Sequence, residues 1–452
     1  MTDSNRRVVI TGVGALTPLG VGAPLLFDSL LKGKTGFRNI ERWDTTEYTT
    51  KFAAEVRGCV YQPDDHYTTR EQKRMDPFAQ IGLVAAREAW LDSGLEKDVI
   101  DSTRSGAILG TGIGGIQSVL DQKDVLDKDV IDSTRSGAIL GTGIGGIQSV
   151  LDQKDVLDKG GPRRVTPFFI SNTMANSLSA NVAIEFGLQG ACFLTSSACA
   201  SSGHAIGMAF REIRTGRADV MVTGGSETTT NALCLAGFNS LKALSTRNDD
   251  IQRSSRPFDR DRDGFVMGEG AGVLVIESLE HAQARGAKIY AEIAGFGQTD
   301  DAGHITAPDA TAQRPAAALK AAMNDAGIND DEVDYINAHG TSTMMNDMIE
   351  TLAIKVALGE GNAKKVAISS SKSMLGHLVG AAAAVEGIAC AYTLANGVAH
   401  QTQNLDNPDV ENGCDLDYIP NEPREGDFKT ALSTSLGFGG HNVCIAFRKF
   451  EG

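Results

Sequence analysis

The sequence predicts an α/β protein in which buried strands alternate with helices. Paired glycines beside apolar runs, as at Gly224-Gly225 and Gly439-Gly440, are typical of tight turns between strands and helices. Apolar stretches predict strands at 7–12, 105–110, 191–197, 218–224, 271–277, 333–338, 366–371, 430–435 and 442–448. Helical patterns occur at 78–93, 199–215, 313–327, 347–358 and 380–396. This alternation favours stacked layers of sheet and helix.

Length and composition indicate a globular, non-membrane protein. The 452 residues suffice for a large core and for two domains or one duplicated domain, and 41% of them are hydrophobic. The net charge of −15 argues against a nucleic-acid partner. No signal peptide is expected, because the polar Met1–Arg7 leads into a strand, and no stretch of 18 apolar residues predicts a membrane span. Scattered cysteines without a CxxC pair fit a reducing cytoplasm.

Cys199 is the first candidate for a reactive group. It follows the predicted strand 191–197 and precedes a helical pattern that includes Ile206 and Phe210, so it falls at a strand-to-helix turn. Free N–H groups at a helix N-terminus favour the thiolate and can hold an oxyanion. The alternative is a buried core cysteine, which is the interpretation we prefer for the other six. Those six are Cys59, Cys192, Cys234, Cys390, Cys414 and Cys444.

Two histidines follow other predicted strands and are framed by small residues. His339 lies in the run 337–343, and His377 ends the run 371–377. Open α/β sheets place their functional sites at the carboxyl ends of strands, so both imidazoles are site candidates. A thiol with two imidazoles suits acyl transfer and carbanion chemistry. His204, on the helix after Cys199, is expected to be structural.

These three runs resemble the active-site motifs of the β-ketoacyl-[acyl-carrier-protein] synthases, specifically the elongating enzymes of dissociated, type II fatty acid synthesis. The resemblance extends from 7–14 through 256–265 to 437–442. It implies a thiolase-like fold with α-β-α-β-α layers built from two similar halves. We place the division after residue 283, so that 1–283 carries Cys199 and 284–452 carries both histidines.

The resemblance also implies a role for each motif residue. Cys199 would be the nucleophile, and His339 and His377 the catalytic pair. Phe438 would be a gating side chain whose N–H joins that of Cys199 in an oxyanion hole. Lys372 and Glu386 would form a supporting charged pair, for which an ordinary structural ion pair is the alternative. Acidic positions after His339 are matched by Asp347 and Glu350.

The implied reaction is a decarboxylative condensation. Cys199 takes an acyl group, and malonyl carrier protein loses CO₂ to give an enolate that attacks it. No metal or redox cofactor is implied, and the enzyme would be a homodimer. Met344 and Leu436 depart from residues common in the family, proline and phenylalanine, and could reshape the acyl pocket.

Acyl carrier protein is the partner that the resemblance implies. Because carrier proteins are themselves acidic, docking on a chain of net charge −15 requires a local basic patch. Otherwise these charges form only a solvated face. The candidates are Arg70, Lys73, Arg74, Arg163, Arg164 and Lys242.

Residues 98–128 and 129–159 are identical, a tandem repeat of 31 residues. A recent duplication and an error of sequence assembly both explain it. Only one copy can supply the sheet strand, so the other would be looped out and would expose an apolar strand. Each copy also contains G-x-G-x-x-G, but no acidic residue follows at the end of a next strand, so we do not expect a dinucleotide site.

Three other functions remain open at this stage. A ketosynthase of polyketide assembly would use the same residues. A non-catalytic partner subunit would lack the cysteine, so Cys199 argues against that class. The duplication could also leave an inactive chain.

Overall fold

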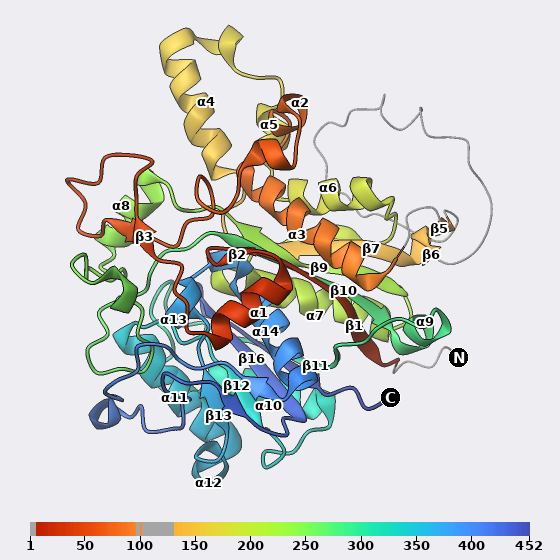
Figure 1. The fold of residues 1–452 in the computed structure, drawn as a ribbon, viewed down its shortest axis with the longest axis vertical. Coiled ribbons are helices and arrows are strands. Elements are labelled where there is room, and N and C mark those ends of the chain that lie inside the picture. The colour runs from red at the N-terminus through yellow and green to blue at the C-terminus, as the bar shows by residue number, and fades with distance from the viewer. Residues whose placement is uncertain (1–5, 96–99, 102–130) are drawn as a thin grey trace.

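The computed structural model describes residues 6–95, 100–101 and 131–452. Figure 1 shows a layered α/β molecule, with a helical projection at one end formed by α4 (Ile147–Gly160), α5 (Phe169–Thr173) and α2 (Thr69–Gln72). The predicted α/β class is therefore confirmed. The predicted strand 105–110 lies outside the described residues.

The main sheet consists of two halves with the same strand order. The first half runs β8-β7-β9-β10-β1, and the second runs β13-β12-β16-β17-β11. In each half the first three strands pair with one another in parallel. The fourth strand pairs antiparallel with both the third and the fifth. β1 and β11 pair antiparallel through Val8–Ile10 and join the halves.

The bounds of the strands of this sheet are as follows. In the first half they are β1 Val8–Thr17, β2 Gly20–Val21, β7 Ser136–Gly141, β8 Cys192–Thr195, β9 Val220–Glu227 and β10 Gly270–Ser278. In the second half they are β11 Ala291–Asp300, β12 Tyr335–Asn337, β13 Ala367–Ser369, β16 Thr430–Gly437 and β17 His441–Arg448. Two-stranded pairs are β3 Arg38–Asn39 with β4 Phe52–Ala53, β5 Ile100–Asp101 with β6 Ile131–Asp132, and β14 Val398–Ala399 with β15 Arg424–Glu425.

Helices form three layers around the two half-sheets. The central layer is α7 and α14, which pack on each other and on strands of both halves. One outer layer is α3 with α6, and the other is α10 with α11. The larger helices are α1 Ala23–Leu31, α3 Pro77–Ser93, α6 Ser177–Phe186, α7 Ser201–Arg214, α8 Ala232–Ser240, α10 Gln313–Ala326, α11 Met344–Leu358 and α14 Ala382–Asn396. Short helices are α9 Leu279–Ala284, α12 Glu360–Ala363 and α13 Lys372–Leu375.

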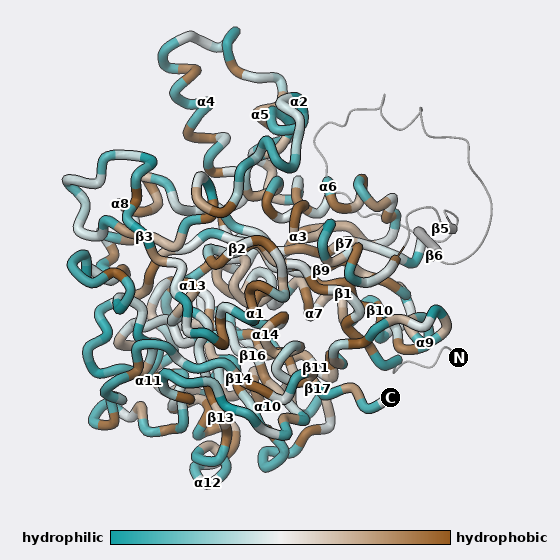
Figure 2. Tube along the Cα trace, viewed as in Figure 1, coloured by the Kyte–Doolittle hydropathy of each residue, from teal (hydrophilic) through white to brown (hydrophobic). Residues whose placement is uncertain are grey.

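The hydrophobic core follows these layers. The central cluster includes Ile206 on α7, Val385 on α14 and Ile445 on β17. A second cluster lies under α3, and a third lies between the second half-sheet and the helices α10 and α11. Figure 2 shows apolar chain along the interior strands and helices and polar chain along the outer loops. Burial on both faces explains why the strands are near-continuous apolar runs.

The second copy of the repeat supplies a strand and a helix to the fold. Its residues Ser136–Gly141 form β7, between β9 and β8, and Ile147–Gly160 form α4. Gly141 is needed at the end of β7, because a Cβ there would lie 2.5 Å from the Ser201 carbonyl carbon. The close approach of β7 to the start of α7 therefore fixes the turn that carries Cys199.

One stretch of the described chain, Val379–Asn396, is long and apolar enough to cross a membrane. Of this stretch, 83% is buried inside the protein. Its composition therefore matches its position in the central helical layer.

Candidate active site

Cys199 lies in a tight turn between β8 and α7. The short 3₁₀ helix η6 (Ala198–Ala200) connects the two elements, and Ala198 has φ of 50°, a left-handed conformation that is unusual outside glycine. The Ser201 hydroxyl donates to the Ala198 carbonyl at 2.6 Å and accepts from the Ser197 N–H at 2.9 Å. These bonds hold the turn in this conformation.

His377 lies next to the thiol. Its Nε2 is 2.9 Å from the Cys199 sulfur. Its backbone pairs with the segment 266–268, donating to the Val266 carbonyl at 2.7 Å and accepting from the Gly268 N–H at 3.0 Å. The Val379 N–H donates to His377 Nδ1 at 3.3 Å. Because Nδ1 accepts this bond, the proton of the neutral ring is on Nε2, which faces the sulfur.

His339 completes the cluster from the second half of the protein. Its ring lies 5.3 Å from that of His377 at an angle of 87°. One ligand atom from each of Cys199, His339 and His377 lies within 4.8 Å of the other two. Among the described residues, this is the only group of three or more His, Cys, Asp or Glu side chains close enough together to hold a metal ion. A thiol with two imidazoles is a donor set for zinc. His339 Nδ1 is buried without a hydrogen-bond partner.

The backbone of the His339 loop is held by one carboxylate. Glu350 Oε1 accepts from the His339 N–H and Oε2 from the Gly340 N–H, both at 2.7 Å. Thr434 donates to Glu350 Oε1 at 2.6 Å and accepts from the His339 N–H at 3.2 Å. Burial nevertheless raises the pKa of Glu350 to about 7. Glu350 therefore positions the histidine loop without contacting the thiol.

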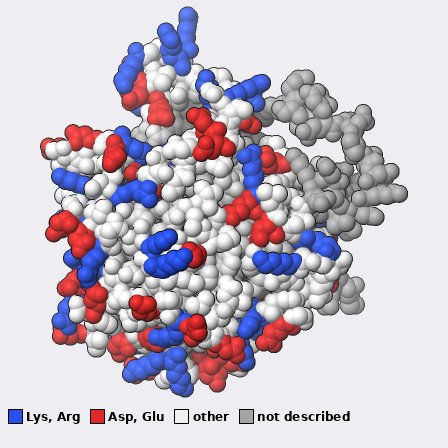
Figure 3. All heavy atoms as spheres, in the orientation of Figure 1, with Lys and Arg blue, Asp and Glu red and all other residues white. Residues whose placement is uncertain are grey.

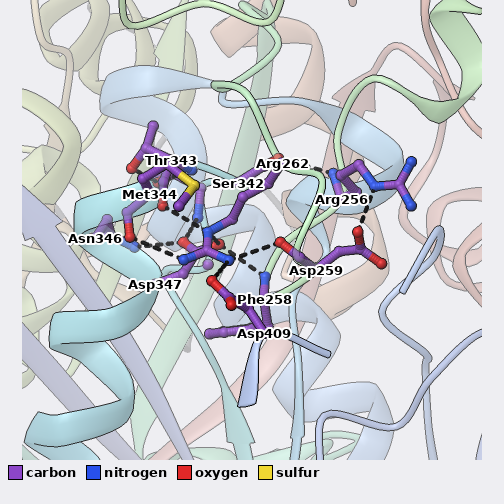
Figure 4. A network of polar contacts seen from close by, with 12 residues as sticks. Arg256, Phe258, Asp259, Arg262, Ser342, Thr343, Met344, Asn346, Asp347 and Asp409 are labelled. Carbon is purple, nitrogen blue, oxygen red and sulfur yellow. Dashed lines mark hydrogen bonds and ion pairs between the residues drawn. The ribbon is translucent and has the colours of Figure 1, made fainter. Parts of the chain in front are cut away.

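A second buried network supports the same loop from outside (Figure 4). Asp347 accepts from the Phe258 N–H at 2.9 Å and from the Thr341 N–H at 3.1 Å. The fully buried Arg262 lies 3.5 Å from Asp347 and 2.8 Å from Asp409. Because each charge has an opposite partner, the network can exist in the interior and hold the loop that follows His339.

Lys372 and Glu386 form a buried ion pair near the cluster. Lys372 Nζ donates to Glu386 Oε1, and both side chains are 2% exposed. The positive charge of Lys372 lowers the pKa of Cys199, and it also lowers that of both imidazoles. Burial remains the largest cause at both histidines and holds the pKa of each well below its usual range. Both imidazoles are therefore neutral at physiological pH.

Burial of Cys199 acts against the thiolate form that the helix N-terminus favours. Burial raises the pKa of Cys199 to about 11, from 9.0, although Lys372 and the N–H groups of Phe438 and Cys199 act in the opposite direction. Desolvation of a sulfur anion among closely packed segments exceeds the effect of the helix end. The N–H groups of Phe438 and Cys199 both point toward the sulfur. From there they can stabilise the oxyanion of a thioester carbonyl that the sulfur attacks. The Phe438 side chain is 39% exposed.

The structure places the remaining sequence candidates as follows. All six basic docking candidates are exposed. Arg74 lies over the Phe168 ring at 5.4 Å, so the α2 region adjoins the segment that carries Arg163 and Arg164. Figure 3 shows basic side chains on the helical projection, with acidic ones among them. His204 bonds the Ser197 hydroxyl at 2.7 Å, as a structural residue would.

The interpretation of Cys59 as core filler is wrong. Cys59 is exposed, because it lies in a turn closed by a bond from its N–H to the Val56 carbonyl. Cys192, Cys390, Cys414 and Cys444 are buried, and Cys234 is partly buried.

Sequence reasoning missed Glu227, Val379 and Thr434. Glu227 ends β9 without a surrounding motif, and Val379 acts through its backbone. A charged residue at the end of an all-buried strand was the signal that could have found Glu227.

Comparison with known proteins defines the family. The model of the N-terminal domain of β-ketoacyl synthase matches residues 5–129 and 119–282, and that of the C-terminal domain matches 290–406. The chain therefore belongs to the β-ketoacyl synthase family.

Individual proteins are similar to this chain over nearly its whole length. The chain is 42% identical over 447 residues to 3-oxoacyl-[acyl-carrier-protein] synthase 2 of Vibrio cholerae, covering 99% of this chain and 100% of the relative. It is 44% identical over 450 residues to the Staphylococcus aureus protein of the same name, with the same coverage. A β-ketoacyl synthase structure from Burkholderia phymatum superposes with a TM-score of 0.85 at 33% identity, covering 99% of this chain and 100% of that one. These matches confirm the thiolase-like fold built from two similar halves.

Proposed function

We propose that the protein catalyses decarboxylative condensation of an acyl group with malonyl-[acyl-carrier-protein], which gives 3-oxoacyl-[acyl-carrier-protein] in fatty acid elongation. The observation that carries this proposal is the meeting of Cys199, His377 and His339 beneath two backbone N–H groups. The names of the curated relatives, at 42% and 44% identity over the whole chain, support the same reaction.

The first half-reaction is transfer of the acyl group to Cys199. The sulfur attacks the thioester carbonyl of the acyl carrier protein, and the oxyanion is held by the N–H groups of Cys199 and Phe438. When the intermediate collapses, the carrier thiol leaves with the proton that Cys199 loses. Because the pKa of Cys199 is about 11, the nearby positive charge of Lys372 assists as the sulfur becomes anionic.

The second half-reaction forms the new carbon–carbon bond. The malonyl thioester oxygen accepts hydrogen bonds from the neutral His377 and His339, while its carboxylate leaves as CO₂ and the electron pair forms an enolate. The enolate carbon attacks the acyl carbonyl on Cys199, the carbon–sulfur bond breaks, and the released sulfur takes a proton from solvent. Neutral imidazoles suit this role, because each can donate an N–H without requiring a counter-charge.

A ketosynthase of polyketide assembly is the second candidate. One structural neighbour is a type II polyketide ketosynthase in complex with its acyl-carrier protein, with a TM-score of 0.84 and 33% identity over 99% of this chain and 100% of that one. The relatives named for the elongating synthase are more similar in sequence, so we favour fatty acid elongation.

The partner and assembly belong to the same proposal. An acyl carrier protein would dock on the basic candidates around α2 and η5 (Pro162–Arg164), since these side chains are exposed.

We infer a homodimer, because β8 ends the described sheet path and α4 has no buried residue, so that both can be covered by a second copy. Seven free cysteines support a cytoplasmic location. The division between halves is proposed after residue 283, between β10 and β11.

The test is a condensation assay with acyl- and malonyl-carrier protein. The wild type should release CO₂ and form the 3-oxoacyl product. Cys199→Ala should form none, because no neighbouring side chain replaces the thiol, although some malonyl decarboxylation can survive on the histidines. A variant that still condensed would contradict the assignment of the nucleophile.

A further inference from the structure

Glu227 is a fully buried carboxylate that joins two loops beside the thiol. Its Oε2 accepts from the Gly143 N–H at 2.5 Å and from the Gly380 N–H at 3.1 Å. Its Oε1 accepts from the Thr142 hydroxyl at 3.1 Å. Thr142 and Gly143 follow β7, whereas Gly380 belongs to η8 (Val379–Ala381), which follows His377. One side chain therefore fixes the distance between the two loops.

The contact at Gly380 continues directly to the catalytic candidates. Val379 has φ of 47°, an outlier for a β-branched residue, and its N–H holds His377 Nδ1. Such a conformation persists only where the surroundings over-determine it. The Glu227 bond to the next residue supplies that constraint. A chain of contacts thus leads from Glu227 through the Val379–Gly380 peptide and His377 to the Cys199 sulfur.

The two loops are packed closely together at this point. A Cβ on Gly380 would lie 2.2 Å from the Gly143 nitrogen and 2.6 Å from Glu227 Oε2. A Cβ on Gly143 would lie 2.9 Å from Glu227 Oε2 and 3.0 Å from Val379 Cγ1. The two backbones approach each other because both residues are glycine, and the carboxylate accepts the N–H groups that this approach buries.

Two thiols of the described chain are affected by the charge of Glu227, which raises the pKa of Cys199 on η6 and of Cys234 on α8. Arg57, which lowers the pKa of Cys234, also donates to the carbonyl of the adjacent residue Thr228. The loop 142–146 and η8 present only N–H groups and one hydroxyl to it. Burial raises the pKa of Glu227 to about 7, and the bonds from Gly143, Thr142 and Gly380 act against that rise. The carboxylate thus changes charge within the physiological range.

We propose that Glu227 is a positioning residue for the condensation, which holds His377 against Cys199 by fixing η8 to the loop that follows β7. This inference rests on the proposed function. It assigns to the second copy of the repeat, which carries Thr142 and Gly143, a direct part in the organisation of the site.

Glu227→Leu tests the inference, since it keeps most of the side-chain volume but leaves the N–H groups of Gly143 and Gly380 without their acceptor. We expect kcat for condensation to fall by about 10-fold or more, with KM for malonyl carrier protein changed less than about 2-fold, because the reacting groups are misplaced rather than removed. The alkylation rate of Cys199 by iodoacetamide should instead rise, because loss of the nearby negative charge lowers the pKa of the thiol. Misfolding would also expose the buried thiol and speed alkylation, so the variant must first show the same urea unfolding midpoint as the wild type.

The pH profile supplies a second readout. In the wild type, Glu227 and Glu350 both have pKa values of about 7, so kcat should fall below pH 7 with a slope between one and two protons. In Glu227→Leu, Glu350 is the remaining one of these two groups, so the slope should decrease toward that of one proton. A kcat within 2-fold of wild type, an unchanged slope, or parallel losses of kcat and alkylation would each overturn the proposal.

The repeat provides a matched control. Thr142→Val removes one donor to Glu227 and should lower kcat by a smaller factor, about 3-fold. Thr111→Val is the same substitution in the identical sequence of the first copy and should leave kcat unchanged, whereas equal losses would contradict the assignment to the second copy.

Alkylation of Cys199 by iodoacetamide requires no substrate. A wild type that fails to condense would therefore refute the proposed function, while the alkylation result would still decide the role of Glu227.

Discussion

The Lys372–Glu386 pair gives a stability prediction whose size follows from burial. Both side chains are 2% exposed, so solvent does not screen the pair. Lys372→Met keeps most of the stem volume but leaves Glu386 without its cation. Removing one partner of a buried pair costs about 3–5 kcal/mol of unfolding free energy. We expect a loss of that size at pH 8, measured by urea unfolding.

The pH dependence of this loss has a definite sign. Burial already raises the pKa of Glu386, and Lys372 opposes the rise, so the variant should raise it further. A carboxyl whose pKa is raised on folding contributes stability below its unfolded value, near 4.5, and loses it as the pH increases toward the folded value. The difference between wild type and Lys372→Met should therefore be larger at pH 8 than at pH 5.

The double variant Lys372→Met with Glu386→Leu is the matched control. It removes both charges, so it should recover most of the lost stability and differ from wild type by less than about 2 kcal/mol. In Lys372→Met, alkylation of Cys199 should also slow, because Lys372 lowers the pKa of that thiol. A single variant that loses less than about 1 kcal/mol at pH 8, or loses more at pH 5, would refute the charged-pair account.

Two further predictions concern the histidines and the docking surface. His339→Ala and His377→Ala should each lower condensation by about 10²-fold, the order for loss of an oxyanion donor, while acyl transfer to Cys199 suffers less. Condensation at the wild-type rate would remove that histidine from the mechanism. Reversing Lys73 and Arg74 to Glu should raise KM for carrier-bound substrate but not for a small thioester, and added salt should weaken the wild type in the same way. Equal loss on both substrates would indicate damage to the fold.

The sequence predicted the fold class and the identity of the clustered residues well. Cys199 follows the partly buried β8, whereas His339 and His377 follow the buried β12 and β13. Ligand atoms of the three side chains lie within 4.8 Å of one another. Local sequence patterns were enough to predict these residues, because the apolar strand pattern and the small flanking residues both occur within short segments of the sequence.

Other features depend on tertiary packing and were not accessible. The raised pKa of Cys199 is one of them, because burial, which no local run reports, opposes the effect of the helix N-terminus. Glu227 has no motif, since its partners Gly143 and Gly380 are distant in sequence. Identical repeat copies likewise give no local signal of which one forms β7, and only the paired strands show that it is the second.

The central claim is that Cys199 carries the acyl group during condensation. Intact-mass measurement of the purified protein after incubation with acyl-carrier protein, followed by peptide mapping, tests it most directly. The account predicts one acyl adduct, on Cys199, which disappears when malonyl-carrier protein is added. An adduct on another cysteine, or none on a folded protein, would contradict it.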